Sequence, residues 1–294
     1  MTDTGETFEA QRPALLALAY RMLGELARAE DVVQEAWIRW QRRPGEVDSP
    51  KAFLLTTVAR LCLDELGSAR ARREESRSDR LPEPVELDRA GLGRVELLDR
   101  ISMAFLVLLQ RLTAAERAVL LLHDVFDMTH AEIAARLEKS EPACRQLLRR
   151  ARENVATERR TLRTSRDEHQ RLLAAFMEAS ARGDQGALLD LLAEDAVLVA
   201  DAGPGVVRYG RIRNVGRPVV GGLKVAALLA SVARQRVGPP LELRERTLNG
   251  EPAAVAFEGG RPVSAILLGV AEGKVRHVYL QADPERLRHV GSLD

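Results

Sequence analysis

The periodicity of apolar residues changes along this chain, and the change limits the folds that it can adopt. Up to about residue 160, apolar side chains recur at helical spacing, in segments such as 14–23 and 29–40. After Pro240 they alternate as they do in strands, and the segments that alternate are 241–248, 253–257, 263–270 and 275–281. The sequence therefore predicts an all-helical part followed by an α+β domain with a curved antiparallel sheet.

Breaks in this pattern divide the chain into four stretches. Residues 8–73 and 95–160 form two helical domains, and the second is predicted to contain four helices. Residues 74–94 between them are charged and interrupted by proline and glycine, as is typical of a linker. Residues 168–290 form the α+β domain. Its predicted elements before the alternating segments are helices over 169–182, 185–192 and 223–234 and a short strand over 196–200.

Composition excludes several classes of protein. A hydrophobic fraction of 46% and a charged fraction of 30% indicate a folded chain and not a disordered one. The two cysteines, Cys62 and Cys144, lie far apart within helical patterns, so they are predicted to be reduced thiols in the cytoplasm. No apolar stretch has the length of a membrane span, and the histidines form no metal-ligand pattern. We expect no cofactor, no metal and no membrane partner.

A helix-turn-helix is predicted between Thr129 and Asn154. The spacing of Thr113 and Glu116, and of Thr129 and Glu132, fits the capping box that marks the start of a helix. The second helix of the motif has an apolar side and an outer side rich in arginine, which suits the major groove of DNA. The candidate DNA-contacting residues on this helix are Glu141, Arg145, Gln146, Arg149 and Arg150.

The turn of this motif lacks the usual glycine. Glu138 and Lys139 occupy the place where glycine would tolerate a positive φ. A non-glycine residue in that conformation costs roughly 1–2 kcal/mol. The sequence therefore predicts a turn that forms at some energetic cost.

The N-terminal helices narrow the function. Asp31, Gln34 and Glu35 lie on one helical face, at spacing i, i+3 and i+4. The segment 29–37 around them resembles the core-polymerase-binding segment of extracytoplasmic-function sigma factors. The segment 49–64 resembles the part of those proteins that recognises and melts the −10 element, and the segment 112–152 resembles region 4, which recognises the −35 element.

The resemblance implies core RNA polymerase and promoter DNA, both duplex and single-stranded, as partners. It implies a polymerase-binding surface made of Asp31, Val32, Gln34, Glu35 and Ile38. It also implies a −10 surface, whose positive charge suits single-stranded DNA and whose members are Arg42, Arg43, Ser49, Lys51, Arg60, Arg70, Arg72 and Arg73. It further implies that the arginine-rich outer side of the second helix of the helix-turn-helix contacts the −35 element.

The C-terminal extension resembles that of the sigma-J-type subgroup, which carries a SnoaL-like domain of the NTF2-like fold. The resemblance rests on the segments 81–84, 201–206 and 283–287, with Arg80 in the place of the subgroup's tryptophan. The extension is thought to stand in for a separate anti-sigma factor. The implied regulatory contacts are Leu81, Pro82, Glu83, Pro84, Asp201, Gly203, Gly205, Asp283 and Pro284.

The sequence thus favours a sigma factor that is not an enzyme and whose C-terminal domain modulates its activity. Two alternatives stay open. One is a stand-alone helix-turn-helix regulator that acts without polymerase. The other is a SnoaL-like isomerase or cyclase with a DNA-binding appendage, for which Asp201, His277 and Tyr279 are the candidate catalytic residues. A small-molecule effector of the C-terminal domain is a further open partner.

Overall fold

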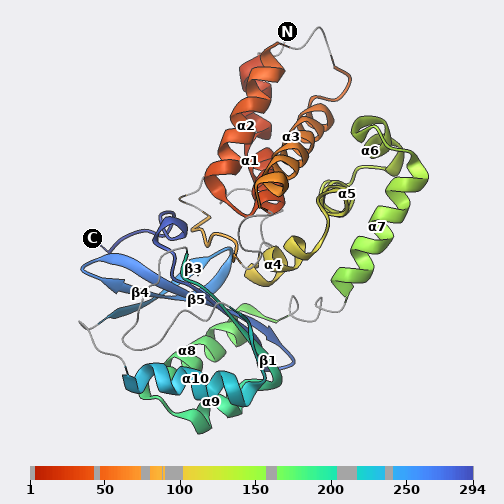
Figure 1. The fold of residues 1–294 in the computed structure, drawn as a ribbon. Coiled ribbons are helices and arrows are strands. Elements are labelled where there is room, and N and C mark those ends of the chain that lie inside the picture. The colour runs from red at the N-terminus through yellow and green to blue at the C-terminus, as the bar shows by residue number, and fades with distance from the viewer. Residues whose placement is uncertain are drawn as a thin grey trace. The chain divides into compact units, whose positions relative to one another are not determined.

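The computed structural model describes residues 4–42, 47–73, 80–87, 89, 102–156, 164–203, 217–235 and 241–293. The chain divides into two compact units (Figure 1). The first unit contains residues 1–77, 91–99 and 108–157, and the second contains residues 78–90, 100–107 and 158–294. Within these described residues, no helix combines the length and the apolar character that crossing a membrane requires.

The first unit is helical throughout its described part. Its helices are α1 (Thr4–Leu23), α2 (Leu26–Gln41), α3 (Pro50–Arg73), α5 (Ala114–Asp124), α6 (His130–Leu137) and α7 (Glu141–Ala156). Helix α4 (Met103–Arg111) begins in the second unit and ends in the first. Four helices therefore lie in 102–156, as the sequence predicted.

Aromatic side chains fill the core formed by α1, α2 and α3. Trp40 is buried, and its ring lies 5.8 Å from that of Phe53. The ring of Trp37 lies 4.9 Å from that of Phe8, between α2 and α1. Both tryptophans therefore serve packing.

Two arginines, Arg117 and Arg60, connect the two predicted helical domains within this unit. Arg117 of α5 donates a hydrogen bond to the backbone carbonyl of Met22, at the C-terminal end of α1. That position suits a cation, because the last carbonyls of a helix carry partial negative charge. Arg60 of α3 forms an ion pair with Glu138 at 2.8 Å. The two domains predicted from the sequence therefore pack as one unit.

The predicted helix starts are confirmed. Thr113 and Thr129 each accept a hydrogen bond from the backbone N–H of a glutamate three residues later, and Glu116 and Glu132 complete the two capping boxes. At the start of α3, the Ala52 N–H donates to the Ser49 hydroxyl at 3.3 Å. These caps satisfy donors that a helix terminus would leave unpaired.

The turn of the helix-turn-helix forms without glycine. Glu138 has φ 54° and ψ 44°, in the left-handed region, and its N–H bonds to the carbonyl of Ala134. The Lys139 N–H bonds to the same carbonyl at 3.0 Å. The turn therefore has the geometry that glycine usually supplies, with a glutamate in the strained position.

Glu138→Gly is expected to stabilise the first unit by about 1 kcal/mol, since glycine adopts this conformation without the Cβ clash. The loss of the exposed ion pair with Arg60 offsets only part of this gain. Thermal and denaturant unfolding of the full chain would measure the change. The matched control is Glu153→Gly on the exposed side of α7, three residues before the helix ends, which should destabilise by up to about 1 kcal/mol. A loss of stability in both variants would contradict the prediction.

The second unit is an α+β domain. Its helices are α8 (Arg166–Arg182), α9 (Gln185–Leu191) and α10 (Gly222–Gln235). Its strands are β1 (Leu192–Asp201), β2 (Val219–Val220), β3 (Glu242–Leu248), β4 (Glu251–Glu258), β5 (Arg261–Ala271) and β6 (Lys274–Gln281), and the short 3-10 helix η3 (Pro284–Arg286) follows. The strands form one sheet in the order β2-β1-β6-β5-β4-β3.

The sheet is mixed, whereas the sequence predicted an antiparallel one. Strand β1 runs parallel to β6, with Val197 opposite His277 and Asp201 opposite Gln281. The other four pairings are antiparallel. Tight turns join β3 to β6 in succession and impose antiparallel pairing, but no turn joins β1 to β6, so local sequence does not set their direction. Register shifts in β1, β4 and β5 bend the sheet.

Each face of the sheet has its own apolar core. Phe176, Val225, Leu268 and Val278 belong to the core on the side of α8, α9 and α10 (Figure 1). Adjacent residues of a strand point to opposite faces of the sheet. Leu267 and Tyr279, which are next to Leu268 and Val278 in the chain, therefore belong to the second core. Its larger members are Leu81, Met103, Phe257, Leu267, Tyr279 and Leu287. The linker residue Leu81 and the first turn of α4 therefore cover a sheet face that carries no long helix of the domain.

Candidate nucleic-acid interface and linker contacts

Helix α7 has one buried side and one exposed side. Cys144, Leu148, Ala151 and Val155 are buried, and α7 packs on α5 and α6. All five residues predicted to contact the −35 element are exposed, namely Glu141, Arg145, Gln146, Arg149 and Arg150. The helix therefore presents a row of hydrogen-bond donors over a fixed apolar base, which is the arrangement that base-edge contacts require.

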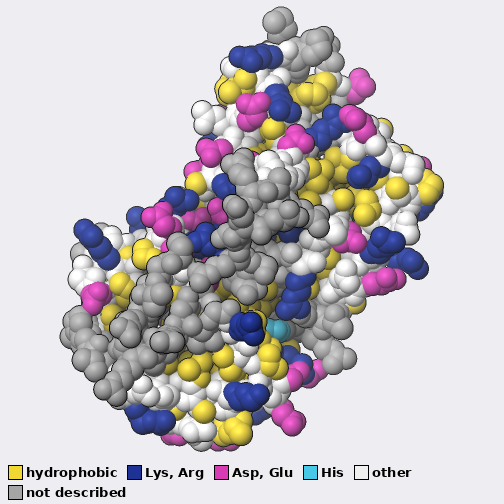
Figure 2. Space-filling view, viewed as in Figure 1, with side chains coloured by type: hydrophobic (Ala, Val, Ile, Leu, Met, Phe, Trp, Pro, Cys, Tyr) yellow, Lys and Arg dark blue, Asp and Glu magenta, His cyan; other side chains and the backbone are white. Residues whose placement is uncertain are grey.

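The ion pairs of these arginines are weak ones. Arg145 pairs with Glu141, and Arg149 pairs with Glu153 at 3.8 Å, in each case one turn away on the same exposed helix side. Exposed pairs of this kind contribute at most about 1 kcal/mol, so a phosphate or a base edge can replace them. On the face drawn in Figure 2, basic and acidic side chains are interspersed.

Arg152 has a different role from the other arginines of α7. Its Nε donates to Asp124 of α5 at 3.2 Å. This hydrogen bond raises the pKa of Arg152. Burial alone would raise the pKa of Asp124, but the hydrogen bonds from Arg152 and His123 lower it below its usual value. Arg152 therefore holds α7 against α5.

The described members of the predicted −10 surface lie at the end of α2 and in α3. Arg42, Ser49 and Lys51 are exposed, and Arg60 is half-exposed in its pair with Glu138. The Ser49 hydroxyl caps α3. Arg43 lies outside the described residues, as do the side chains of Arg70, Arg72 and Arg73.

The predicted polymerase-binding face on α2 is mostly accessible. Asp31 and Gln34 are exposed, and Glu35 and Ile38 are half-buried. Glu35 pairs with Arg39 at 3.0 Å. Val32, which the sequence placed on this surface, is only 8% exposed because it packs in the core with Val33 and Ala36. We leave Val32 out of the exposed surface.

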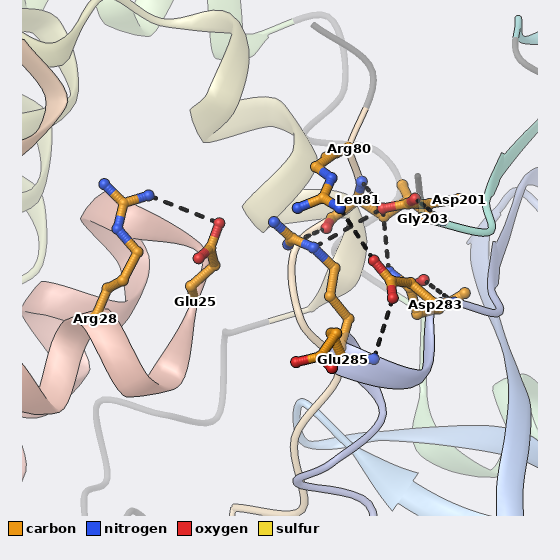
Figure 3. Close-up of polar contacts among 10 residues, drawn as sticks. Glu25, Arg28, Arg80, Leu81, Asp201, Gly203, Asp283 and Glu285 are labelled. Carbon is orange, nitrogen blue, oxygen red and sulfur yellow. Dashed lines mark hydrogen bonds and ion pairs between the residues drawn. The ribbon is translucent and has the colours of Figure 1, made fainter. Parts of the chain in front are cut away.

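Asp201 joins the linker to the α+β domain (Figure 3). Its Oδ2 accepts a hydrogen bond from the Leu81 N–H at 3.1 Å, and its Oδ1 accepts one from the Gly203 N–H at 2.9 Å. Arg286 donates to the Leu81 carbonyl at 2.6 Å, and its Nε lies 4.0 Å from Oδ2 of Asp201. Both charged side chains are buried, at 7% and 6% exposure. We call Leu81, Asp201 and Arg286 the linker clasp.

Asp283 makes a second contact beside the linker clasp. Its Oδ2 lies 3.2 Å from Arg80 of the linker, and its Oδ1 caps η3 by accepting from the Glu285 N–H at 3.1 Å. Arg80 therefore places a cation against a carboxylate of the C-terminal segment. Gly203 has φ +70°, and a Cβ there would lie 2.5 Å from the Asp283 side chain. Only glycine fits this approach.

The remaining linker residues are also held within the second unit. Pro82, Glu83 and Pro84 are buried. The carboxylate of Glu83 lies 3.3 Å from Arg288 and 2.8 Å from the ring of His289. Two other predicted contacts differ from this pattern, because Pro284 is exposed as the first residue of η3 and Gly205 lies outside the described residues.

Four partners of the linker were not identified from the sequence. Asn249 exchanges two hydrogen bonds with the backbone of Val85, at 2.8 and 2.9 Å. Arg286 bonds to Leu81, and Arg288 and His289 face Glu83. The Asn249-Gly250 pair was interpreted only as a hairpin turn, and the Asn249 φ of 52° agrees with that turn. Separations of 164 to 206 residues left no local signal for these contacts.

The side chains considered for catalysis make packing and hydrogen-bond contacts. His277 and Tyr279 on β6 are stacked, with centroids 5.7 Å apart and an interplanar angle of 5°. Tyr279 is buried in the second core of the sheet. Across the described ranges, no three histidine, cysteine or acidic residues form a group that could hold a metal ion.

Comparisons with known proteins agree on one family. Residues 7–72 match "Sigma-70 region 2", and residues 102–155 match "Sigma-70, region 4". From Mycobacterium tuberculosis, the ECF RNA polymerase sigma factor SigJ is 35% identical over 95% of this chain and 91% of its own length, and the probable sigma factor SigI is 32% identical over 95% and 93%. The crystal structure of that SigJ matches with a TM-score of 0.73 at 32% identity, over 97% of this chain and 98% of the other.

Proposed function

Because the chain belongs to the extracytoplasmic-function RNA polymerase sigma factors of the sigma-70 family, we propose that its helical domains contact separate promoter elements and that its α+β domain regulates them. As a sigma factor, the protein binds core polymerase and directs transcription initiation at promoters. Residues 8–73 bind the core enzyme and melt the −10 element, residues 95–160 recognise the −35 element, and residues 168–290 regulate. The protein acts in the cytoplasm, with the polymerase.

The exposed arginine side of α7 carries this proposal. Arg145 and Arg149 lie one turn apart on the outer side, and the opposite side is buried. A helix placed in this way in a helix-turn-helix enters the major groove, where arginine donates two hydrogen bonds to guanine. Single-stranded DNA needs positive charge along its backbone. The exposed side chains of Arg42 and Lys51 supply such charge near α3.

Transcription in vitro tests the function as a whole. The purified chain and core polymerase would be combined on promoter fragments that the holoenzyme selects from genomic DNA. We expect run-off transcripts that depend on the chain. If no fragment supports chain-dependent initiation, the proposal is wrong.

Asp31→Ala combined with Glu35→Ala is expected to weaken binding to core polymerase by at least about fivefold, since the few hot-spot residues at the centre of an interface each cost more than about 1 kcal/mol when truncated. Fluorescence anisotropy of labelled full-length chain, titrated with core enzyme, measures the affinity. The matched control is Glu178→Ala with Asp190→Ala, two exposed acids of the α+β domain, of which Glu178 pairs with Arg182 one turn away. Equal affinity of the test and control variants would remove the α2 face from the interface.

The regulatory part of the proposal rests on the linker clasp. Leu81 is held by its backbone through Asp201 and Arg286 and by its side chain in the second core of the sheet. The linker connects the two DNA-binding domains, so a domain that holds the linker can change their freedom to reach both elements. Transcription by the chain truncated after residue 163 should therefore differ from that of the full chain on a fixed promoter, and identical activity would contradict regulation.

We propose that the α+β domain does not catalyse a reaction. A general base in an isomerase site has to be free to accept a proton from its substrate. In this chain, both carboxylate oxygens of Asp201 accept backbone hydrogen bonds, and Arg286 lies beside them. These contacts support a structural role for Asp201. A screen of small molecules against wild type and Asp201→Asn would reveal turnover if this part of the proposal is wrong.

A further inference from the structure

Two histidines meet beside α7. His123 is the penultimate residue of α5, and His130 is the first residue of α6. Their ring centroids lie 4.6 Å apart, with the planes tilted by 53°. Both side chains are partly exposed. Neither belongs to the residues that the sequence or the proposed function assigns to DNA.

Two carboxylates near this pair, those of Asp124 and Glu141, are already bound to arginines. Asp124 of α5 lies 2.9 Å from Nδ1 of His123 and also binds Arg152. Glu141 of α7 pairs with Arg145. On α6 itself, the carboxylate of Glu132 accepts from the Thr129 N–H at 2.8 Å. On α3, which also packs on α6, Arg60 binds Glu138 beyond the C-terminal end of α6, away from His130.

The charge of this cluster therefore depends on the histidines. With both rings neutral, the two arginines, Arg145 and Arg152, balance the two carboxylates, Asp124 and Glu141, so the net charge is zero. One proton bound at His130 makes the cluster +1. Burial first, and then the charges of His123 and Arg145, hold the pKa of His130 below its usual value. An anion placed against the rings reverses this effect, because it favours the protonated form.

We infer that His123 and His130 form a proton-linked contact for a phosphate of the DNA backbone beside α7. In a helix-turn-helix, the first helix crosses the backbone while the second lies in the major groove. Here α6 is that first helix, and His130 opens it. Arg145 of α7 lies close enough to act electrostatically on His130. The inference rests on the proposed role of α7 and adds to it a contact whose strength depends on pH.

A metal ion is a poorer occupant of this place. His123 uses Nδ1 in its contact with Asp124, and Asp124 is held by Arg152 as well. In the part of the chain that the structure describes, these groups do not form a three-ligand cluster. A phosphate oxygen needs only an N–H donor and positive charge. A neutral imidazole has one N–H, and protonation makes both ring nitrogens donors and adds the charge.

The experiment measures the salt dependence of DNA binding at two pH values. The full chain is titrated into a fluorescein-labelled 20-base-pair duplex of fixed sequence at pH 7.8 and pH 5.8, because phosphate contacts do not require a particular sequence. Each phosphate contact adds about 0.9 to the slope of log affinity against log salt. For wild type we expect a slope steeper by about 0.9 at the lower pH, together with a roughly threefold to tenfold gain in affinity at low salt.

Three variants decide the interpretation. His130→Gln should show the same slope at both pH values, and His130→Lys should show the steep slope at both, because lysine keeps its charge. If His130→Gln keeps the pH-dependent slope of wild type, the inference is overturned. The double variant Arg145→Ala with Arg149→Ala should bind more weakly at both pH values. If it binds as wild type does, the proposed role of α7 itself fails, which is a separate result from failure of the histidine contact alone.

Discussion

Asp201→Ala is expected to lower the free energy of unfolding of the second unit by about 3–5 kcal/mol, as removal of one partner of a buried ion pair typically does. The substitution leaves the buried guanidinium of Arg286 without its carboxylate. It also removes the acceptor for the N–H groups of Leu81 and Gly203. Unpaired buried donors are costly because water cannot replace the lost oxygen.

Denaturant unfolding of the full chain measures the free energy of unfolding, and a separate hydrogen-exchange experiment shows where the structure is weakened. The amide of Leu81 should exchange much faster in the variant, since its hydrogen bond is gone. The matched control is Asp195→Ala, whose carboxylate is 68% exposed in its pair with Arg276 and should cost less than about 1 kcal/mol. If Asp201→Ala does not fold, Asp201→Asn keeps one acceptor oxygen and should show a smaller loss with the same exchange pattern. Equal stability of the Asp201 and Asp195 variants would show that the linker clasp contributes nothing.

Arg145→Ala should weaken binding of the holoenzyme to its −35 element by about 1–3 kcal/mol and relax the sequence preference at one position. Arg145 is on the exposed side of α7, and its ion pair with Glu141, which a base edge would have to replace, is also exposed. Binding to a panel of promoters with single substitutions in the −35 element would measure both quantities.

The control for this prediction is an arginine with a similar ion pair on a helix of the α+β domain. Arg182→Ala on α8 removes an exposed arginine that pairs with Glu178 one turn away, as Arg145 pairs with Glu141. It should leave promoter affinity unchanged. If Arg145→Ala weakens all sequences equally, Arg145 contacts a phosphate and not a base.

Much of the DNA-binding surface could be predicted because its signals are local. The capping boxes at Thr113 and Thr129 place the helix starts by contacts that span three residues. The alternation of Cys144, Leu148 and Ala151 with arginines identifies which side of α7 is buried. Val32 shows the limit of this reasoning, since it lies between Asp31 and Gln34 but points into the core.

The linker contacts show what local patterns omit. The sequence identified Leu81, Asp201 and Asp283 by resemblance, and the structure brings them together. Arg286, Arg288, His289 and Asn249 were not among the predicted contacts, although each of them binds the linker. A buried Glu83 needs cationic partners, but nothing near it in the chain indicates that they come from the C-terminal end.

Local patterns in the sequence were enough to predict the helices, the turn at Glu138, five of the six strands in the described residues, and the family. These features depend on hydrogen bonds and apolar spacing within a few residues. The parallel direction of β1 and β6 and the covering of the second face of the sheet by the linker follow from tertiary packing. These features arise where surfaces distant in the sequence come into contact, and the free energy of such contacts comes from burial and pairing between both surfaces at once.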